Sequence, residues 1–466
     1  MSWKTIVKEN SLDISEISLE EVLKLNRLDG EYYKPLYLGY EKQITSRGYK
    51  EIQSFASITD GIHSSIDFDE QSTINLLSAM SPKDNYFDIS RNKAISETQH
   101  KKNPRTELQE GDVIVSTVGT IGNCAVVDKT VLPANSDRHI GIIRVKSDYL
   151  PHFLSTFLLT KYGKFQTLRE ATGNVQLNLF IEKIRTLKVP ITSNAFQKVI
   201  SDTVVKALSL REQARNGYNE AEKLLLKEIN LEGYVSSKEN TSIRELTECL
   251  TDNRFDAEYW QLKFDGILER INAYTGGVSK IQDEFSQIKN NFKSDPETLY
   301  RYVEIGDVDV STGEVSFSEM EGKELPANAK ITLGEKQLVT SKVRPNRGAT
   351  AILDNQKGYI ASGAFVVLKE AGKVTLETLQ VYLKTALIRD LLLRYNTGTA
   401  YPTIIDADIL NLPLPLVNKN VQEAITEKVK QCSKERIEAR ELFEKAKRAV
   451  EIFIEKDEQE ALKYLA

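Results

Sequence analysis

Cysteine is scarce in this sequence. Its 466 residues include only Cys124, Cys249 and Cys432, and each lies more than a hundred residues from the next. Neither a Cys-x-x-Cys metal site nor a disulfide framework can be read from that spacing. The four histidines also lack the spacing of metal ligands. We therefore expect no metal site and a place in the reducing cytoplasm.

Long apolar runs and an excess of basic charge are also absent. No uninterrupted apolar stretch reaches about 18 residues, and the opening MSWKTIVKENSLDIS has no apolar core flanked by basic residues. We expect neither a membrane span nor export. The 62 Lys and Arg against 67 Asp and Glu give a net charge of −5, which excludes a strongly basic nucleic-acid coat. Local clusters of Lys and Arg are not excluded, because phosphate binding depends on where they gather.

The sequence does contain an internal duplication. RLDGEYY (Arg27–Tyr33) recurs as RFDAEYW (Arg254–Trp260) at an offset of 227 residues. VIVSTV (Val113–Val118), followed by GNCAVV, is echoed by LVTSKV (Leu338–Val343), followed by GATAIL, at an offset of 225 to 226. Repeated landmarks in one order indicate one unit written twice.

Each half continues with a Thr-Gly loop and a segment that ends on proline. The first reads ATGNVQLNLFIEKIRTLKVPI from Ala171, and the second reads NTGTAYPTIIDADILNLPLPL from Asn396. Three landmarks match between the halves: Thr172, Gly173 and Pro190 correspond to Thr397, Gly398 and Pro415. A long charged stretch with helical periodicity follows each proline.

The middle of each half predicts strands followed by a short helix. Runs of β-branched residues broken by Gly and Asn lie at 111–128 and 139–145, and again at 336–343, 348–354 and 363–369. Helical periodicity follows at 151–168 and 376–395. The fold class expected for the globular parts is α+β.

Two long amphipathic helices are predicted, at Asn194–Leu231 and Asn418–Tyr464. The seam of the first is expected to consist of Val199, Thr203, Leu208, Ala214, Ala221, Leu224 and Leu225. The seam of the second is expected to consist of Ile425, Val429, Ala439, Leu442, Ala446, Val450 and Ile454. Such helices pack most simply as an antiparallel coiled coil, and surplus apolar surface would remain for a partner protein. The alternative is that each helix caps an ordinary domain.

In this order the motifs resemble those of the specificity subunit of type I restriction-modification enzymes. RLDGEYYKP is similar to the opening of that family's target-recognition domain, GDVIVSTVGTIG to its strand and glycine loop, and TGNVQLNLFIEKIRTLKVPI to its segment closing on proline. SKVRPNRG resembles an arginine-proline variant of the glycine loop. The second half departs at TGTAYPTI, where Tyr401 and Pro402 stand for Leu177 and Asn178 of the first half.

The resemblance implies a fold of two tandem α/β target-recognition domains alternating with two long helices. The expected bounds are 1–192 for an N-terminal segment and domain 1, 193–232 for the central helix, 233–416 for a linker and domain 2, and 417–466 for the C-terminal helix. It also implies that each domain reads half of a split, asymmetric DNA site and that the helices set the gap. Two copies of a methyltransferase subunit, which binds S-adenosylmethionine, would dock on the helices, and a nuclease-translocase subunit would join for restriction.

Catalytic motifs are missing, so we expect a non-catalytic subunit without a cofactor of its own. An amino-methyltransferase would show Asn/Asp-Pro-Pro-aromatic, and the only Asn-Pro is Asn103-Pro104. There is no G-x-x-x-x-G-K-[ST] phosphate loop, and the pair Asp406 and Asp408 has no nuclease-type lysine motif nearby. A coiled-coil scaffold that does not bind DNA is the alternative. It accounts for the helices but not for the paired loops rich in Arg, Asn and Gln.

Loop residues with cationic, amide or hydroxyl side chains are the candidate DNA contacts, because phosphates take cations and base edges take forked or planar groups. The candidates in the first half are Lys101, Lys102, Arg105, Ser116, Thr117, Thr120, Asn123, Arg138, His139, Asn174 and Gln176. Those in the second half are Lys342, Arg344, Asn346, Arg347, Thr397, Thr399 and Tyr401. The competing interpretation is a solvated turn for the cluster at 101–105 and an ordinary hairpin turn for the loop at 116–123. The three cations at 342–347 are expected to be exposed. Arg27, Asp29, Glu31 and their counterparts Arg254, Asp256 and Glu258 are expected to form ion pairs or caps.

Overall fold

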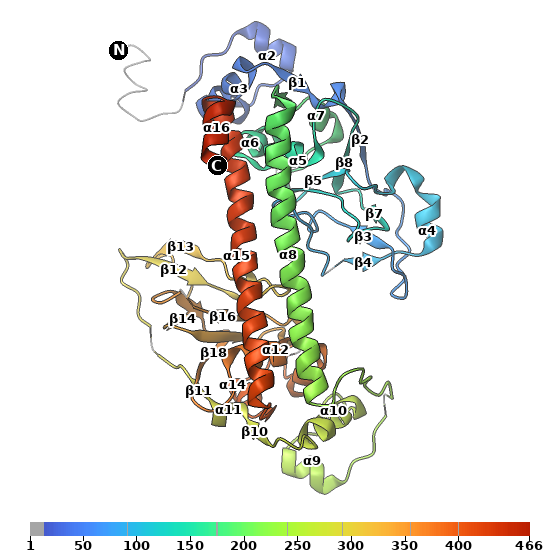
Figure 1. Ribbon diagram of the computed structural model, residues 1–466, viewed down its shortest axis with the longest axis vertical. Helices are drawn as coiled ribbons and strands as arrows, with labels where there is room; N and C mark the ends of the chain where they lie inside the picture. The colour runs from blue at the N-terminus through green and yellow to red at the C-terminus, as the bar shows by residue number, and fades with distance from the viewer. Residues whose placement is uncertain are drawn as a thin grey trace. The chain divides into compact units, whose positions relative to one another are not determined.

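The computed structural model describes residues 14–90, 92–173, 176–239, 241–290, 292–354, 356–398 and 400–466. Its contacts form two compact units: unit 1 comprises Met1–Arg211 and Arg436–Ala466, and unit 2 comprises Glu212–Glu435. The division falls within both long helices, α8 (Asn194–Glu228) and α15 (Lys419–Glu455), so each helix contributes one segment to each unit (Figure 1).

Unit 1 is built on a four-stranded antiparallel sheet in the order β2-β8-β5-β6. Its strands are β2 (Ala56–Asp60), β8 (Ile140–Val145), β5 (Val113–Ser116) and β6 (Cys124–Val126). A smaller sheet has the order β4-β3-β7, from β4 (Lys93–Ala94), β3 (Asn75–Leu77) and β7 (Ala134–Ser136), and β1 (Tyr49–Glu51) pairs with β9 (Lys188–Pro190). The helices of the globular part are α2 (Leu19–Leu25), α3 (Pro35–Ser46), α4 (Glu97–Lys102), α5 (Pro151–Leu159), α6 (Lys161–Glu170) and α7 (Ile181–Arg185).

The continuous apolar runs of the main strands follow from burial on both faces of the sheet. Successive side chains of a strand point to opposite faces. Val113 and Val115 lie in the core shared with α5 and the long helices. Ile114 lies in a second cluster with Leu77 and Val131. A strand covered on both sides therefore has no need of alternating polar residues.

Unit 2 repeats this plan. Its main sheet has the order β11-β18-β15-β16, from β11 (Phe285–Gln287), β18 (Phe365–Glu370), β15 (Gln337–Ser341) and β16 (Thr350–Leu353). A second sheet has the order β13-β12-β17-β14, from β13 (Ser318–Glu321), β12 (Leu299–Val303), β17 (Ile360–Ser362) and β14 (Ala329–Thr332), and β10 (Val278–Lys280) pairs with β19 (Pro413–Pro415). The helices are α9 (Leu246–Asp252), α10 (Leu262–Asn272), α11 (Ile281–Glu284), α12 (Leu376–Lys384), α13 (Ala386–Leu391) and α14 (Asp406–Leu410).

The equivalent elements keep one spacing along the chain. Strand β8 begins at residue 140 and β18 at 365, and β9 begins at 188 and β19 at 413, an offset of 225 in both cases. The predicted duplication and the mixed α and β fold are confirmed.

One helix predicted in each half is in fact two. The helix expected at 151–168 is broken at Thr160, and the one expected at 376–395 is broken at Thr385, 225 residues later. Both threonines have extended backbones (ψ of 165° and 145°), and their side chains accept a hydrogen bond from the first turn of the next helix. A threonine in that role caps a new helix, which helical periodicity alone does not reveal.

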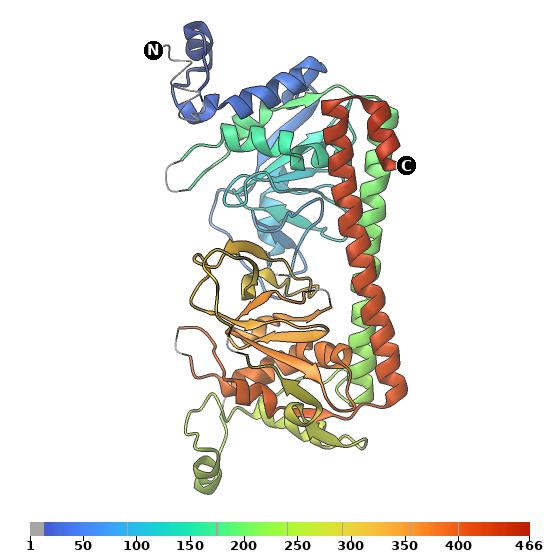
Figure 2. The ribbon, with the colours of Figure 1, turned by 90° about the vertical axis from the view of Figure 1, so that its left-hand side faces the viewer.

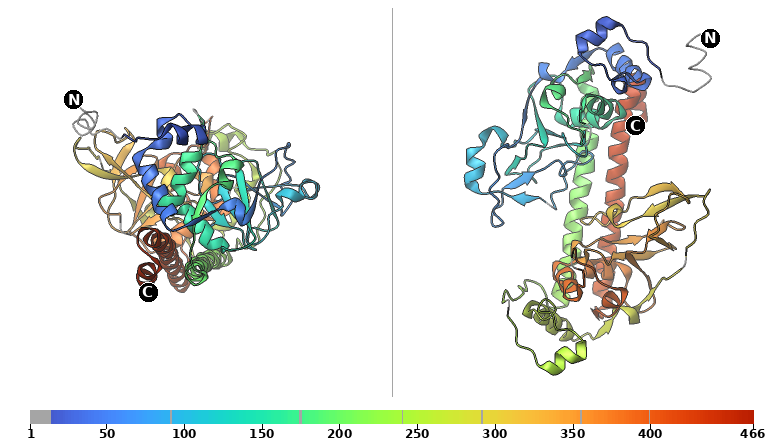
Figure 3. Two further views of the ribbon diagram at one scale, coloured as in Figure 1. Left: turned by 90° about the horizontal axis from the view of Figure 1, so that it is seen from above. Right: turned by 180° about the vertical axis from the view of Figure 1, so that it is seen from behind.

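Segments of α8 and α15 pack together within each unit, and Figures 1 and 3 show them side by side. In unit 1, Phe196 contacts Phe453 with ring centroids 5.3 Å apart, and Lys206 pairs with Glu438 at 3.2 Å. In unit 2, Lys428 pairs with Glu220 at 2.6 Å. Lys206 comes after Phe196 in α8, whereas its partner Glu438 comes before Phe453 in α15. The two segments therefore run antiparallel in unit 1.

The seam predicted for the first long helix was only partly correct. Ala214, Ala221 and Leu225 are buried, but Val199 is 37% exposed. The buried seam of the unit 1 segment consists instead of Phe196, Ile200, Val204 and Ala207. The face that an amphipathic helix buries is set by its neighbours, and here the neighbours include α5 as well as α15. For the second helix, six of the seven predicted residues are buried and Leu442 is partly buried.

The second long helix ends earlier than predicted. Helix α15 stops at Glu455, and Asp457, with an extended backbone, caps a separate helix α16 (Glu458–Leu465) through its side chain. Helix α16 turns back along the end of α15, where Lys445 donates to the carbonyl oxygen of Leu465 at 2.7 Å (Figure 2). Among the described residues, no helix combines the length and apolar character required to cross a bilayer.

Candidate nucleic-acid interface

The candidate residues of unit 1 gather at one end of its main sheet. Strand β2 ends at Asp60 and pairs there with Gly141 at the start of β8, while β5 ends at Ser116 beside Ile140. Every loop that carries a candidate side chain leaves or approaches the sheet at this end, or is tied to it by hydrogen bonds. An antiparallel sheet thus brings together residues that lie up to about a hundred positions apart in the sequence.

Three backbone contacts join the loops of unit 1. The N–H of Thr117 donates to the carbonyl oxygen of His139 at 3.0 Å, and the N–H of Leu179 donates to that of Thr117 at 2.9 Å. Val118 and Asn178 form a bridge between the glycine loop and the Thr-Gly loop. The glycine loop, the start of β8 and the Thr-Gly loop therefore form one continuous surface.

Hydroxyl side chains of the glycine loop hold its shape. Ser116 is buried, and its Oγ donates to the carbonyl oxygen of Ala79 at 2.6 Å; the hydroxyl of exposed Thr120 donates to the same oxygen at 3.3 Å. Thr117 is also buried. Gly122 has a positive φ of 81°, and a Cβ there would lie 2.6 Å from Oγ1 of Thr167, so glycine is required for the close approach to α6.

Amide and basic groups stand on the outside of the same loops. Arg138 is exposed, and its Nε lies 3.3 Å from Nε2 of His139, which is half-buried beside Asp137. Gln176 is exposed and Asn123 is half-buried. Asn174 lies outside the described residues.

The basic cluster of unit 1 is partly neutralised. Lys101 and Lys102 end α4 and are exposed, with Lys101 paired to Glu97 at 2.6 Å. Arg105 donates to Asp60 at 2.8 Å and to the hydroxyl of Thr59 at 2.5 Å. Burial raises the pKa of Asp60, but the hydrogen bonds from Arg105 and His63 outweigh it, so this pKa lies below its ordinary value. Arg105 therefore ties its turn to the end of β2.

Unit 2 repeats the loop contacts of unit 1. The N–H of Ile404 donates to the carbonyl oxygen of Lys342 at 3.0 Å, as Leu179 does to Thr117. Val343 bridges Thr403, as Val118 bridges Asn178. Asn178 thus corresponds to Thr403, 225 residues later, and the sequence alignment of Asn178 with Pro402 was wrong by one position. Tyr401 consequently corresponds to Gln176.

The cations of unit 2 differ in their surroundings. Lys342 was expected to be exposed, but its side chain is only 20% exposed and pairs with Asp406 at 2.6 Å. The exposed guanidinium of Arg344 lies 5.3 Å from the ring centroid of Tyr401. Asn346 and Arg347 are exposed, and the carbonyl oxygen of Asn346 accepts from Arg389 at 3.4 Å.

The Thr-Gly loop of unit 2 is closed by its own backbone. The N–H of Thr397 donates to the carbonyl oxygen of Thr403 at 3.0 Å, and the side chain of Thr397 is exposed. Thr399 lies outside the described residues. Tyr401 is 48% exposed, which leaves much of its ring open to solvent.

Exposed apolar side chains also lie at these loops, although the sequence predicted only polar DNA contacts there. Leu177 and Phe180 of unit 1 and Ile405 of unit 2 are 44%, 57% and 59% exposed. Met80, beside the Ala79 carbonyl that anchors the glycine loop, is 59% exposed. Apolar groups at a groove can contact thymine methyls. The sequence signal for such a contact is an apolar residue within an otherwise polar loop.

The opening motif of each unit has the capping role expected for it. Arg27 donates to Asp29 at 2.8 Å, and Asp29 accepts from the N–H of Tyr32. Two guanidinium groups lie over the ring of Tyr32, at 4.6 Å (Arg27) and 3.9 Å (Arg169) from its centroid.

The same stack recurs in unit 2. The guanidinium groups of Arg254 and Arg394 lie 4.6 Å and 4.2 Å from the ring centroid of Tyr259, and Arg254 donates to Asp256 at 2.6 Å. Because Arg169 and Arg394 each stand just before a Thr-Gly loop, these stacks fix where the loops begin. Sequence reasoning did not single out Arg169 or Arg394.

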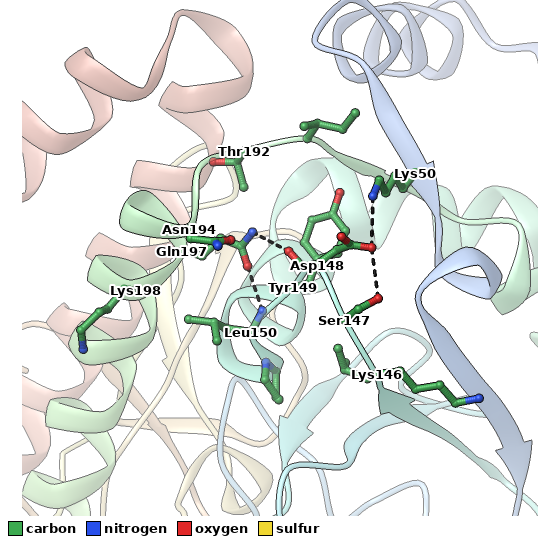
Figure 4. Close-up of a pocket in the computed structure, with 13 residues that line it drawn as sticks. Lys50, Lys146, Ser147, Asp148, Tyr149, Leu150, Thr192, Asn194, Gln197 and Lys198 are labelled. Atoms are coloured by element: carbon green, nitrogen blue, oxygen red, sulfur yellow. Dashed lines mark hydrogen bonds and ion pairs between the residues drawn. The ribbon is translucent and has the colours of Figure 1, made fainter.

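A buried glutamine at the start of each long helix clamps the loop that follows β8 or β18. Gln197 accepts from the N–H of Leu150 at 2.8 Å and donates to the carbonyl oxygen of Asp148 at 3.0 Å (Figure 4). These residues line an open cavity of about 660 Å³. In unit 2, Gln422 accepts from the N–H of Thr375 at 2.9 Å beside a cavity of about 710 Å³. The repeated clamp joins each globular part to a helix.

Comparison with known proteins gives a family match that lies almost entirely within unit 1. Residues 68–216 match the sequence model of the family described as "Type I restriction modification DNA specificity domain". This segment, about a third of the chain, includes β5, β6 and β8 of the main sheet, but not β2, together with the glycine loop and the Thr-Gly loop of unit 1. Residues 68–216 are therefore similar to a DNA specificity domain of that family, and the resemblance to type I specificity subunits is confirmed. No curated protein matches the chain.

Solved structures similar to the chain include two S subunits. The type I restriction-modification S subunit from M. genitalium is 11% identical, with a TM-score of 0.40, and the match covers 90% of this chain and 95% of that one. The HsdS subunit from Thermoanaerobacter tengcongensis is 14% identical, with a TM-score of 0.27, covering 90% and 95%.

Proposed function

We propose that this chain is the DNA-reading subunit of a type I restriction-modification complex. Each unit reads one half of a bipartite, asymmetric DNA site. The chain itself carries out no catalysis and binds no cofactor. S-adenosylmethionine belongs to a partner methyltransferase subunit, of which two copies dock on this chain. A nuclease-translocase subunit joins when the complex restricts DNA.

One observation carries the proposal. The segment that matches a DNA specificity domain builds its loop surface with the contact from Leu179 to Thr117, and unit 2 builds its surface with the equivalent contact from Ile404 to Lys342. A protein with two surfaces of the same construction is suited to reading two sites on one duplex.

Side-chain exposure and ion pairs with other elements divide the candidate residues into three groups. We propose that the residues of the first group, which are exposed, face DNA: Lys101, Lys102, Thr120, Arg138, Gln176, Arg344, Asn346, Arg347, Thr397 and Tyr401. Ser116 and Thr117, which are buried, and Arg105 and Lys342, which are paired with carboxylates, hold the loops in position. Asn123 and His139 are half-buried at the edge of the same surface. The divergence of the loops between units favours two unlike half-sites.

The long helices are proposed to pair as an antiparallel coiled coil that sets the gap between half-sites and docks the methyltransferase subunits. The packing of α8 against α15 inside each unit supports this proposal. So do exposed apolar residues of α8 and α15 such as Val205 (49%) and Ile437 (42%), which leave surface for a partner.

Salt dependence of duplex binding tests the proposal. Each phosphate neutralised by Lys or Arg releases counterions, so the affinity of the full chain for a duplex of random sequence should fall steeply between low and moderate salt. The charge-reversing pair Lys101→Glu and Lys102→Glu should lower both affinity and slope. The same reversal at Lys323 and Lys357, exposed residues of unit 2 paired with Glu321 and Glu335, is the control. Absence of any salt slope would overturn the proposed function.

A further inference from the structure

Arg344 has a backbone conformation that arginine rarely adopts. Its φ and ψ are both 52°, in the left-handed region, where the Cβ of an L residue crowds the backbone. The equivalent residue of unit 1, 225 positions earlier, is Gly119, with φ of 72°. The following residue, Pro345, restricts Arg344 further, because a residue before proline favours an extended backbone. The loop thus requires a conformation that suits glycine, yet it contains arginine.

The surrounding loop holds Arg344 in this conformation. Its N–H donates to the carbonyl oxygen of Pro402 at 2.7 Å, and its own carbonyl oxygen accepts from the N–H of Arg347 at 2.9 Å. In unit 1 the equivalent turn has glycine, which adopts this backbone conformation without steric strain. Since strain of this kind tends to accompany function, the benefit of arginine at this position must come from its side chain.

The side chain of Arg344 is exposed and oriented. Its guanidinium lies 5.3 Å from the ring centroid of Tyr401, and it forms no ion pair with the described residues. Lys342, two residues earlier, is by contrast neutralised by Asp406. A guanidinium held against an aromatic ring keeps its planar edge of N–H donors available to a ligand.

The ligand of such an edge presents two acceptors in one plane. In the major groove, O6 and N7 of guanine form that pair, and bidentate arginine is their commonest partner. A phosphate contact needs only a nearby cation, for which neither a fixed direction nor a strained backbone is necessary. We propose that Arg344, oriented by Tyr401, binds the O6 and N7 edge of a guanine in the half-site read by unit 2. This inference rests on the proposed function and names one base of its substrate.

Selection of DNA from a randomised duplex library by the full chain tests the proposal. The wild-type chain should enrich a site with a guanine at one position of one half. Arg344→Gly relieves the backbone strain, so the variant should fold at least as well. It should nevertheless lose the guanine preference at that position by about 10- to 100-fold, with the other positions unchanged.

Two further variants separate base contact from charge. Arg344→Lys keeps the charge and lacks the planar fork, so it should also lose the preference. Lys336→Gly is the matched control. Lys336 is an exposed cation of unit 2 with a positive φ of 44°, and it lies at the opposite end of β15. Its replacement should leave the base preference unchanged at every position of the DNA site. Tyr401→Phe should keep the preference, since the ring remains, and Tyr401→Leu should weaken it.

The outcomes distinguish this inference from the proposed function. If Arg344→Gly or Arg344→Lys keeps the full guanine preference, the guanine contact is wrong while the proposed function stands. A wild-type chain that enriches a site without guanine in the affected half also overturns the contact. If the wild-type chain enriches no sequence at all, the proposed function fails and this inference fails with it.

Discussion

Glu41 joins two basic side chains in unit 1. Its carboxylate accepts from Nη1 of Arg169 at 2.6 Å and from Nζ of Lys188. Burial raises the pKa of Glu41, but the hydrogen bonds from Lys188 and Arg169 outweigh it, and this pKa lies below its ordinary value near 4.5. Because Arg169 also stacks on Tyr32, Glu41 fixes the residue that precedes the Thr-Gly loop.

A lowered pKa gives Glu41 a pH-dependent contribution to stability. A carboxyl whose pKa is lower in the folded state stabilises it above the unfolded pKa, and this contribution is lost as pH falls through the folded pKa. Glu41→Gln should reduce the stability of the chain by about 1–3 kcal/mol at pH 7. In thermal unfolding, the gap in Tm between wild type and variant should close as pH falls from 7 to 3.

The control for this prediction is Glu31→Gln, which removes an exposed partner of Lys34. It should change Tm little at any pH, since exposed ion pairs contribute little. If the difference in Tm between wild type and Glu41→Gln stays constant or widens at low pH, Glu41 does not stabilise the fold through its ionised contacts with Arg169 and Lys188.

At the residue scale, the sequence predicted motifs better than it predicted contacts. It identified Arg27 and Asp29 as a structural pair, because both recur in the two halves. It did not predict that Lys342 would pair with Asp406, since the two lie 64 positions apart and meet only when α14 packs beside the loop. Exposure depends on such tertiary neighbours, which local spacing does not contain.

At the level of elements, two glycines inside helices have different surroundings. Gly39, in α3, is exposed and has no atom within 4 Å of a Cβ placed there. Gly217, in α8, faces Cys432 of α15, and a Cβ there would lie 2.9 Å from its Sγ. The close approach of the two long helices in unit 2 therefore depends on Gly217.

Alanine at these two positions should have opposite effects. Gly39→Ala should stabilise the chain by about 0.5–1 kcal/mol, because alanine loses less backbone entropy in a helix. Gly217→Ala gains the same helix stabilisation, but its Cβ crowds buried Cys432. We therefore expect the free energy of unfolding to fall by about 1 kcal/mol. Chemical denaturation measures both.

Cys432→Ala separates the crowding from helix propensity. In that background, Gly217→Ala should become stabilising, because Sγ is gone. Equal stabilisation by Gly39→Ala and Gly217→Ala in the native background would show that the helices do not pack closely at this point.

Elements were predicted well where one signal dominates. The strands around β5 and β15 and both long helices follow from composition and periodicity. The breaks at Thr160, Thr385 and Lys456–Asp457 were missed, because a cap inside a periodic run leaves the run intact. The seam of α8 was partly misplaced, since which face is buried depends on α5 and α15 together.

At the scale of the whole molecule, the helices are proposed to set the spacing between half-sites. Four residues add about 6 Å to a helix, and one base pair adds about 3.4 Å to a duplex. Matched insertions of four helix-forming residues between Arg211 and Glu212 and between Glu435 and Arg436, where the units divide, should lengthen the recognised gap by about one or two base pairs. DNA selection with the full chain reports the gap directly.

An insertion outside the helices is the control for spacing. Four residues between Lys238 and Glu239, in an exposed segment without helix or strand, should leave the gap unchanged. An unchanged gap after the helix insertions, with both half-sites still enriched, would exclude the spacing role of the helices and leave the reading role intact.

The repeat and the order of its parts were evident from the sequence, because duplicated motifs survive at a nearly constant offset. The one-position error at Pro402 shows the limit: the loops diverge in sequence, and only the contact of Val343 with Thr403 fixes their alignment. Under the proposed function, those same loops decide which bases are read.

The central claim is that two unlike units read two halves of one DNA site. Sequencing of methylated bases in cells that contain or lack this chain, together with its methyltransferase partner, tests that claim most directly. We predict one motif with two different halves and a constant gap, present only when the chain is present, and altered in one half alone by Arg344→Gly. A chain-dependent motif that is continuous or palindromic, or no chain-dependent motif at all, would contradict the account.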